Sequence, residues 1–444
     1  MIAAVNKPPT QTETTIGTCR WTICSLVFFA TTINYLDRQV ISLLKPTLET
    51  QFNWTESDYS NIVVAFQFAY ALGMISLGRV IDKVGTKIGY ALTLVFWSIA
   101  SILHAFATGT ASFMIYRAAL GFTEAGNFPA AIKTMAEWFP QRERAYATGI
   151  FNSGTNVGAI IAPVVVPWLA INYSWQAAFV ITGAIGFVWL IFWFLLYEVP
   201  AKHKKLSRAE YNYIHTDAPE KVSLAKEKTK TPWSTLLLYK QAWAFILGKF
   251  FTDGIWWFML FWLPAFLKAE YGLQGMQVSL PIAVVYTLAG IASIFGGWLP
   301  MWFVKKRGWT IIKARKTAMF IYACFPLLVM FSQAAGSYHM WYAIIIIGIA
   351  ASAHQAWSAN LYTIVSDMFP ARLVASVIGI GGMVGSLGGM LVAKCAGLLF
   401  DHYKALGHIQ TGYYIMFIIS GLAYLVAWIV LFRVLVPNMP RVVL

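Results

Sequence analysis

Residues Phe139–Arg142 read Phe-Pro-Gln-Arg, and residues Phe369–Arg372, 230 positions later, read Phe-Pro-Ala-Arg. The match extends outward at the same offset, pairing Ala145, Gly149, Ile150 and Gly158 with Ala375, Gly379, Ile380 and Gly388. Each stretch lies at the same place in its half of the chain, which makes chance a weak explanation. An internal repeat of this kind predicts two parallel halves around a central cavity, an arrangement typical of transporters.

The chain around this repeat is too apolar for a soluble protein. Of its 444 residues, 59% are hydrophobic and only 11% are charged. Soluble globular proteins have roughly 45–50% apolar and about 25% charged residues. A membrane-spanning helix needs ~20 mostly apolar residues, so the composition suffices for about a dozen spans. A soluble enzyme, a secreted disulfide scaffold and a disordered chain are therefore excluded.

We predict an all-α membrane protein with twelve spans in two six-helix halves related by a pseudo-two-fold axis. In the N-terminal half, residues 21–197, the spans lie near 21–44, 60–79, 88–107, 110–137, 145–169 and 177–197. In the C-terminal half, residues 241–435, they lie near 241–267, 279–303, 313–333, 341–366, 373–399 and 411–435. The remaining segments are two short tails and a polar linker, at residues 1–20, 436–444 and 198–240.

The linker contains two recognisable stretches. Ser207–Glu210 reads Ser-Arg-Ala-Glu, which predicts a capping box at the start of a short surface helix. Residues 220–228 are rich in Lys and Glu and are expected to be a solvated charged segment.

The formal charge of +15 does not require a nucleic-acid partner. Lys and Arg gather in alternate loops, those after the second, fourth, sixth, eighth and tenth predicted spans. This bias predicts that these loops and both termini are cytoplasmic. The four cysteines form no Cys-x-x-Cys pair, so we expect neither a disulfide framework nor a metal cluster. The polar residues 1–18 predict no cleavable signal peptide.

Charged residues inside two predicted spans give the strongest functional signal. The first span contains Asp37 and Arg38, and the fourth contains Arg117 and Glu124. Seven residues are about two helical turns, so Arg117 and Glu124 share one face, and Gly121 between them leaves room. Each charge costs ~2.5–3.5 kcal/mol at the centre of a spanning helix, which favours a cavity or a partner.

Two interpretations of these charges are possible. The two acids and two arginines neutralise each other while the site is empty; an anionic substrate then competes for the arginines, and a proton binds a freed carboxylate. Arg suits this role because its planar guanidinium binds a carboxylate through two parallel hydrogen bonds. The alternative is a static ion-pair brace between helices.

Other polar residues in the spans are weaker candidates. Asn152 and Thr155 share a face of the fifth span with Asn156, and Tyr70 lies in the second span. In the tenth span, His354, Trp357 and Asn360 could contact a hydroxylated ligand, and the offset of 230 sets His354 opposite Glu124. Each of these could instead be packing or helix-helix hydrogen bonding. Lys249 and Asp253 are spaced i, i+4 and favour a structural pair over a site.

Residues Gly78–Lys87 lie between the second and third spans and predict a tight loop that latches the two halves on the cytoplasmic side. Gly78 and Gly85 permit close backbone approach, and Asp82 could face a helix N-terminus. This segment resembles the loop motif Gly-x-x-x-Asp-Arg/Lys-x-Gly-x-Lys/Arg of the major facilitator superfamily. The resemblance covers nearly the whole chain.

Further segments resemble one branch of that superfamily. Asn34–Arg38 with Gly121–Pro129 is similar to the anion:cation symporter branch. Within the branch, four segments resemble bacterial hexuronate transporters: Phe151–Gly158, Trp256–Pro264, His354–Asn360 and Gly379–Met383. The eighth span, which includes Tyr286–Ala292, lacks an acid expected of hexuronate relatives and leaves the preferred sugar acid open.

The resemblance implies roles for individual residues. Those implied to contact the substrate are Tyr35, Arg38, Tyr70 and Arg117, and those implied to carry coupled protons are Asp37 and Glu124. The polar face of the fifth span and Trp357 are carried over as further contacts. No cofactor beyond the coupling proton is expected.

These observations together predict a monomeric, proton-coupled symporter of the bacterial inner membrane. It imports a sugar-acid anion, a hexuronate such as glucuronate or galacturonate, by alternating access within the lipid bilayer. The alternatives are a symporter of galactonate or another aldonate or aldarate, a drug/proton antiporter, and a transporter-like sensor. The antiporter motif Gly-Pro-x-x-Gly-Gly is absent from the fifth span, and no enzyme motif occurs in the spans.

Overall fold

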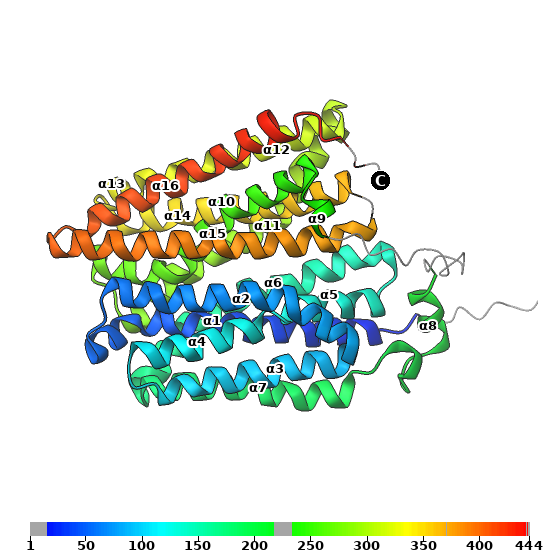
Figure 1. The fold of residues 1–444 in the computed structure, drawn as a ribbon, viewed down its shortest axis with the longest axis horizontal. Coiled ribbons are helices and arrows are strands. Elements are labelled where there is room, and N and C mark those ends of the chain that lie inside the picture. Colours follow the sequence, from blue (N-terminus) through cyan, green and yellow to red (C-terminus); the bar gives the residue numbers. More distant parts are fainter. Residues whose placement is uncertain (1–15, 217–232, 370, 441, 443–444) are drawn as a thin grey trace, which may run out of the picture.

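The computed structural model describes residues 16–216, 233–369, 371–440 and 442, and in these ranges the regular structure is all helical. Its helices lie along one long axis in two groups (Figure 1). The first group contains α1 (Cys19–Phe52), α2 (Glu56–Val84), α3 (Thr86–Leu103), α4 (Thr110–Glu124), α5 (Asn127–Trp138), α6 (Gln141–Asn172) and α7 (Trp175–Leu196). The second contains α10 (Lys240–Tyr271), α11 (Ser279–Arg307), α12 (Ile311–Cys324), α13 (Ser332–Gly336), α14 (Met340–Met368), α15 (Ala371–Ala405) and α16 (Ile409–Ile429). We call them the N-half and the C-half.

Ten helical segments in the described ranges are long and apolar enough to cross a membrane. The two predicted spans outside this set, 21–44 and 110–137, contain the Asp37–Arg38 and Arg117–Glu124 charges. The first lies within the 34-residue helix α1. The second is divided into α4 and α5 at Ala125–Gly126, where a Cβ atom on Gly126 would collide with Thr93 of α3. The polar and charged residues of the first segment lower its hydropathy, whereas the second is divided into helices of 15 and 12 residues, each too short to cross a membrane by itself.

The ninth predicted span is also interrupted. Its α-helical turns give way after Cys324 to a 3₁₀ segment, Phe325–Phe331, before α13 begins. Pro326 lies in the first turn of this segment, where its missing N–H and fixed backbone angle are tolerated.

The predicted repeat is visible in how the two halves pack. In the N-half, a Cβ atom on Gly158 of α6 would collide with the carbonyl oxygen of Thr32 in α1. In the C-half, the repeat partner Gly388 of α15 has the same relation to the carbonyl oxygen of Phe250 in α10. Corresponding glycines therefore bring corresponding helices into backbone contact.

The linker caps the first helix. The backbone N–H groups of Cys19 and Arg20 donate to the Glu210 carboxylate at 3.2 and 3.1 Å, and Arg20 also forms an ion pair with it at 3.0 Å. Glu210 belongs to the short helix α8 (Arg208–Ile214), whose first turn is capped by Ser207. The predicted capping box is thus half realised, because the Glu210 carboxylate accepts hydrogen bonds from the backbone of α1 and not from the Ser207 N–H. The predicted segment 220–228 and tail residues 1–15 lie outside the described residues.

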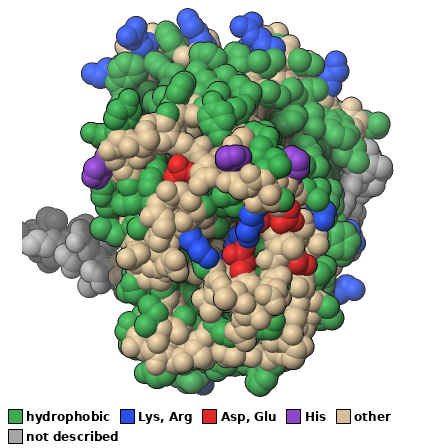
Figure 2. Space-filling view, turned by 90° about the vertical axis from the view of Figure 1, so that its left-hand side faces the viewer, with side chains coloured by type: hydrophobic (Ala, Val, Ile, Leu, Met, Phe, Trp, Pro, Cys, Tyr) green, Lys and Arg blue, Asp and Glu red, His purple; other side chains and the backbone are tan. Residues whose placement is uncertain are grey.

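At the opposite end of the molecule, charged groups join the two halves. The Asp401 carboxylate of α15 accepts hydrogen bonds from the backbone N–H groups of Glu56 and Ser57, at 2.7 and 2.8 Å, and so caps α2 across the interface. Lys45 forms an ion pair with Glu56 at 2.8 Å, and Lys404 approaches the same carboxylate at 3.6 Å. Figure 2 shows acidic and basic side chains gathered near the middle of this end.

The helices α2 and α15 approach each other at Gly382. A Cβ atom on Gly382 would lie 3.3 Å from Met74 of α2. One turn closer to the end that carries α8, a Cβ atom on Gly379 would meet nothing within 4 Å. The contacts between the halves thus include the charged groups at the Asp401 end and Gly382 with Met74, whereas Gly379 adds none.

Candidate functional site

An ion pair between α1 and α4 lies at the centre of the candidate site. The Arg38 Nε and Nη2 atoms both bind Glu124 Oε2, at 2.9 and 2.8 Å, and the two side chains are 1% and 0% exposed. Arg38 Nη2 also donates to Asn34 one turn earlier in α1, at 3.2 Å. The two opposite charges therefore form a buried ion pair.

Four aromatic rings surround the Arg38 guanidinium, and we call them the aromatic cage. The distances from Arg38 Cζ to the ring centres are 4.7 Å for Tyr35, 5.2 Å for Phe66, 5.0 Å for Tyr70 and 5.0 Å for Trp257. Such contacts stabilise a cation that has lost its water. Trp257 belongs to α10, so the cage includes a residue of the C-half and spans the interface.

Arg117 lies beside the pair but uses only part of its hydrogen-bonding capacity. Its Nη2 atom donates to the backbone carbonyl of Arg38 at 2.6 Å, and its guanidinium lies 4.8 Å from the Phe66 ring centre. Its Nε and Nη1 atoms are buried without a hydrogen-bond partner in the protein. A buried donor without a partner is costly, so these atoms are suited to a ligand or a water molecule.

The two buried acids have different surroundings. Asp37 Oδ1 accepts a hydrogen bond from Ser101 of α3 at 3.1 Å, and no ion pair of Asp37 is found within the described ranges. The expected neutralisation of two acids by two arginines therefore holds for Arg38 and Glu124, but not for Asp37. One oxygen of each acid, Asp37 Oδ2 and Glu124 Oε1, is buried without a partner. These two oxygens can accept a proton or a hydrogen bond.

Gly121 fixes the position of the cage. A Cβ atom there would collide with the carbonyl oxygen of Phe66, whose ring lies against both Arg38 and Arg117. The prediction that Gly121 leaves room is confirmed, and the room is taken by the backbone of α2.

We therefore expect Gly121→Ala to displace Phe66 and to destabilise the N-half. Overpacking a well-packed interface costs about 1–3 kcal/mol, so thermal unfolding of the purified protein should occur several degrees below that of the wild type. Gly149→Ala is the matched control, because a Cβ atom at Gly149 meets nothing within 4 Å. Equal unfolding temperatures for the two variants would contradict this account of the packing.

The polar face predicted on α6 is only partly engaged. Thr155 Oγ1 donates to the backbone carbonyl of Asn152, at 2.8 Å. Asn156 Oδ1 is buried without a partner, and its side chain lies near Gly290 of α11 in the C-half. Asn152 is half-buried. These residues line the interface of the two halves, and their contact with a ligand stays a prediction.

The three candidates of the tenth predicted span lie in the C-half, on α14. His354 Nδ1 and the Tyr424 hydroxyl are 2.7 Å apart, and the imidazole stacks on Trp256 with ring centres 4.9 Å apart. Trp357 packs edge-on against Tyr424, at 5.9 Å. Asn360 donates to the backbone carbonyls of Gly296 and Ala356 at 2.7 and 2.9 Å. His354 and Asn360 have hydrogen-bond partners within the C-half, so a ligand would have to compete for them, whereas Trp357 Nε1 is buried without a hydrogen-bond partner.

The latch residues lie at the α8 end, in the N-half. Gly85 has a φ of +85° and joins α2 to α3, a conformation that favours glycine. Asp82 forms an ion pair with Lys133 of α5 at 2.9 Å, and its side chain is 72% exposed. A Cβ atom at Gly78 would approach Pro129 of α5. These contacts stay within the N-half, so the latch between halves stays a prediction.

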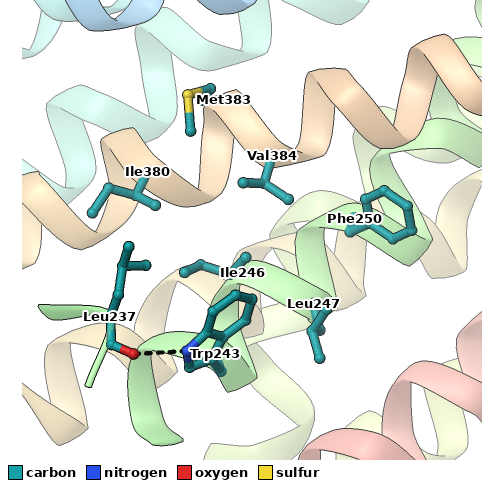
Figure 3. A pocket seen from close by; sticks show the side chains of 8 residues that line it. All are labelled: Leu237, Trp243, Ile246, Leu247, Phe250, Ile380, Met383 and Val384. Carbon is teal, nitrogen blue, oxygen red and sulfur yellow. Dashed lines mark hydrogen bonds between the residues drawn. The ribbon is translucent and has the colours of Figure 1, made fainter. Parts of the chain in front are cut away.

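An apolar cavity of about 400 Å³ lies on the C-half, between α9 (Trp233–Leu236), α10 and α15 (Figure 3). Its lining side chains are Leu237, Trp243, Ile246, Leu247, Phe250, Ile380, Met383 and Val384. The indole of Trp243 donates to the Leu237 carbonyl at 2.8 Å. With no charged group in its lining, this cavity is unsuited to an anion and is separate from the Arg38 site.

Sequence reasoning missed three residues that build the site, Phe66, Ser101 and Trp257. Phe66 and Ser101 are ordinary residues of apolar helices, and no spacing rule relates them to Arg38 or Asp37. For Trp257 a signal was present, because it follows Lys249 and Asp253 at intervals of four along α10. That spacing places all three on one helix face.

Comparisons with known proteins agree with this architecture. Residues 27–393 match the family model described as Major Facilitator Superfamily. The chain is 34% identical over 385 residues to the hexuronate transporter of Escherichia coli (strain K12), which covers 86% of this chain and 88% of that protein. It is 29% identical to the D-galactonate transporter of Escherichia coli O6:H1, over 87% of this chain and 90% of that one. The crystal structure of a D-xylose-proton symporter has the same fold, with a TM-score of 0.74, 16% identity, and coverage of 95% of this chain and 99% of that chain.

Proposed function

The chain belongs to the Major Facilitator Superfamily, and from that premise we propose that it is a proton-coupled symporter that imports a hexuronate such as glucuronate or galacturonate. Members of this family are transporters and not enzymes, and the chain is a multi-pass protein of the bacterial inner membrane. In the proposal the end with α8 is cytoplasmic, and the end closed by Asp401 faces the periplasm.

The proposal rests on one observation, the Arg38–Glu124 pair inside a cage contributed by both halves. A guanidinium binds a carboxylate through two parallel hydrogen bonds, and in the empty site Glu124 occupies those donors. A sugar-acid carboxylate that takes over Arg38 displaces Glu124. The displaced carboxylate is then buried beside a second anion, an arrangement that favours its protonation.

This exchange couples the substrate to the proton. With substrate on Arg38 and a proton on Glu124, the site has one charge fewer to bury than with the substrate alone. Asp37, with one buried oxygen unpartnered, provides a second protonation site close to the pair. Because uncompensated charge resists burial in a low-dielectric site, the loaded and protonated carrier occludes more easily than a partly loaded one. Because Trp257 of α10 contacts the Arg38 guanidinium, a change in what Arg38 binds alters a contact between the two halves.

Uptake of labelled glucuronate into proteoliposomes tests the proposal. We expect accumulation when the outside is acidic, loss of accumulation when the proton gradient is collapsed, competition by galacturonate, and no competition by glucose. Galactonate in the same panel tests the alternative substrate class. Binding of another acid without glucuronate uptake would overturn the hexuronate assignment. Uptake that is indifferent to the gradient would overturn proton coupling, and accumulation against a gradient would exclude a pure sensor.

A further inference from the structure

The C-half contains a second buried charged group that the exchange at Arg38 does not use. Lys249 Nζ lies 2.6 Å from Asp253 Oδ2 and donates to the Tyr362 hydroxyl of α14 at 3.1 Å. The same ammonium lies 4.7 Å from the centre of the Tyr362 ring. A Cβ atom on Gly385 of α15 would lie 2.5 Å from Asp253, so that helix packs directly against the carboxylate. Three helices of the C-half thus meet at this pair.

The pair lies on the helix face that reaches the aromatic cage. Lys249, Asp253 and Trp257 are spaced by four residues along α10, and the Trp257 ring centre is 5.0 Å from the Arg38 guanidinium. Four residues of helix correspond to about 6 Å, so Asp253 lies one turn beyond the cage.

The pair is not sealed from solvent. The Asp253 side chain is 16% exposed, and Tyr362 is 39% exposed. An ion pair that only braces helices is expected to be fully enclosed, whereas part of the Asp253 carboxylate is accessible. Two glycines of α15 border the line from Asp253 to Trp257, since a Cβ atom on Gly385 would lie 2.5 Å from Asp253 and one on Gly389 would lie 3.0 Å from Trp257.

The chemistry of the pair fits hydroxyl groups and not a second carboxylate. Its two charges cancel, and Lys249 already contacts Asp253 and Tyr362, so it lacks the unpartnered cationic donors that Arg117 adds to the Arg38 site. It presents an ammonium donor and a carboxylate acceptor side by side, and a phenol that can do both. A hydroxyl also donates and accepts, so neighbouring hydroxyls on a sugar match this set.

We propose that Lys249, Asp253 and Tyr362 form a hydroxyl-binding subsite for the same sugar acid whose carboxylate binds Arg38, with the sugar ring lying against Trp257. The inference rests on the proposed function, and it names the residues that select among sugar acids. Monocarboxylic sugar acids bind better than dicarboxylic ones such as glucarate, because the second carboxylate would face a neutral pair that contains Asp253.

The test compares two ligands on two proteins. Glucuronate and cyclohexanecarboxylate both have a six-membered ring and a carboxylate, but the second has no hydroxyl groups. Titration calorimetry measures their dissociation constants for the purified wild type and for the double variant Lys249→Met/Asp253→Leu, which leaves no unpaired buried charge. The control is Gln333→Met/Glu270→Leu, which removes a side-chain hydrogen bond of 3.0 Å near the Asp401 end, outside the site.

The expected result is selective. The double variant binds glucuronate about 30-fold more weakly, the loss expected for one or two hydrogen bonds to charged groups, while cyclohexanecarboxylate binding changes less than about threefold. The Gln333/Glu270 control leaves both constants unchanged. If both ligands weaken equally in the double variant, or neither does, the pair is a brace and the inference is overturned. If the wild type binds no sugar acid, the proposed function fails and the subsite fails with it.

Discussion

Arg38→Lys is expected to lower the initial rate of glucuronate uptake about 100-fold, because a lysine retains the charge but not the geometry. In the structure Arg38 uses two nitrogen atoms on a single carboxylate oxygen while four rings surround its plane. An ammonium is a compact, strongly hydrated point charge that neither forms two parallel bonds nor stacks in this way. A loss of about 100-fold corresponds to roughly 2.8 kcal/mol.

Uptake rates in proteoliposomes and calorimetric binding of glucuronate measure this effect. Arg433→Lys is the matched control, since Arg433 is exposed and its guanidinium lies 5.6 Å from the Trp428 ring centre. The control is expected to transport at the wild-type rate. A variant that retained more than about a third of the wild-type rate would have lost less than roughly 1.4 kcal/mol, the energy of a tenfold change. Arg38 would then not be the residue that binds the substrate carboxylate.

Glu124→Gln is expected to abolish accumulation driven by a proton gradient while exchange of labelled for unlabelled substrate continues. A glutamine keeps an oxygen that can accept from Arg38, but it cannot take up a proton when the substrate displaces it. Binding and rocking of the loaded carrier therefore persist without the energetic link to protons. Accumulation ratios with and without an acidic exterior, together with an exchange assay, separate the two functions.

The control for this variant is Glu270→Gln. Glu270 accepts a hydrogen bond from Gln333 at 3.0 Å near the Asp401 end, far along α10 from the cage. The Glu270→Gln substitution makes the same chemical change as Glu124→Gln and should leave proton-driven accumulation intact. Normal gradient-driven accumulation by Glu124→Gln would remove Glu124 from the coupling step and leave Asp37 as the candidate.

The structure also shows which features the sequence could predict. Spacing within one helix was informative: Arg117 and Glu124 share a face, Gly121 admits α2, and Lys249 pairs with Asp253. The internal repeat correctly indicated two halves, with Gly158 and Gly388 in matching contacts. These relations are local, or are repeated within the chain, and a helical period reveals them.

Contacts between helices that are distant in the chain could not be predicted. Trp257 contacts Arg38, Ser101 binds Asp37, and Asp401 caps α2. In each case the two partners are far apart in the chain, and no periodic pattern in the sequence relates them. The divided helix at Ala125–Gly126 was also missed, because Gly126 is short of space only once Thr93 is packed against it. Such features depend on tertiary packing and not on local preference.

The most direct test of the exchange between Glu124 and the substrate is the number of protons taken up when glucuronate binds. A weakly buffered solution of the purified protein with a pH indicator measures it, with ligand and protein adjusted to the same starting pH. The account predicts that the solution becomes more alkaline on addition of glucuronate, and that this change is much smaller for Glu124→Gln at equal occupancy. Saturating binding without proton uptake at any pH between 5 and 8, where proteins are generally most stable, would contradict it.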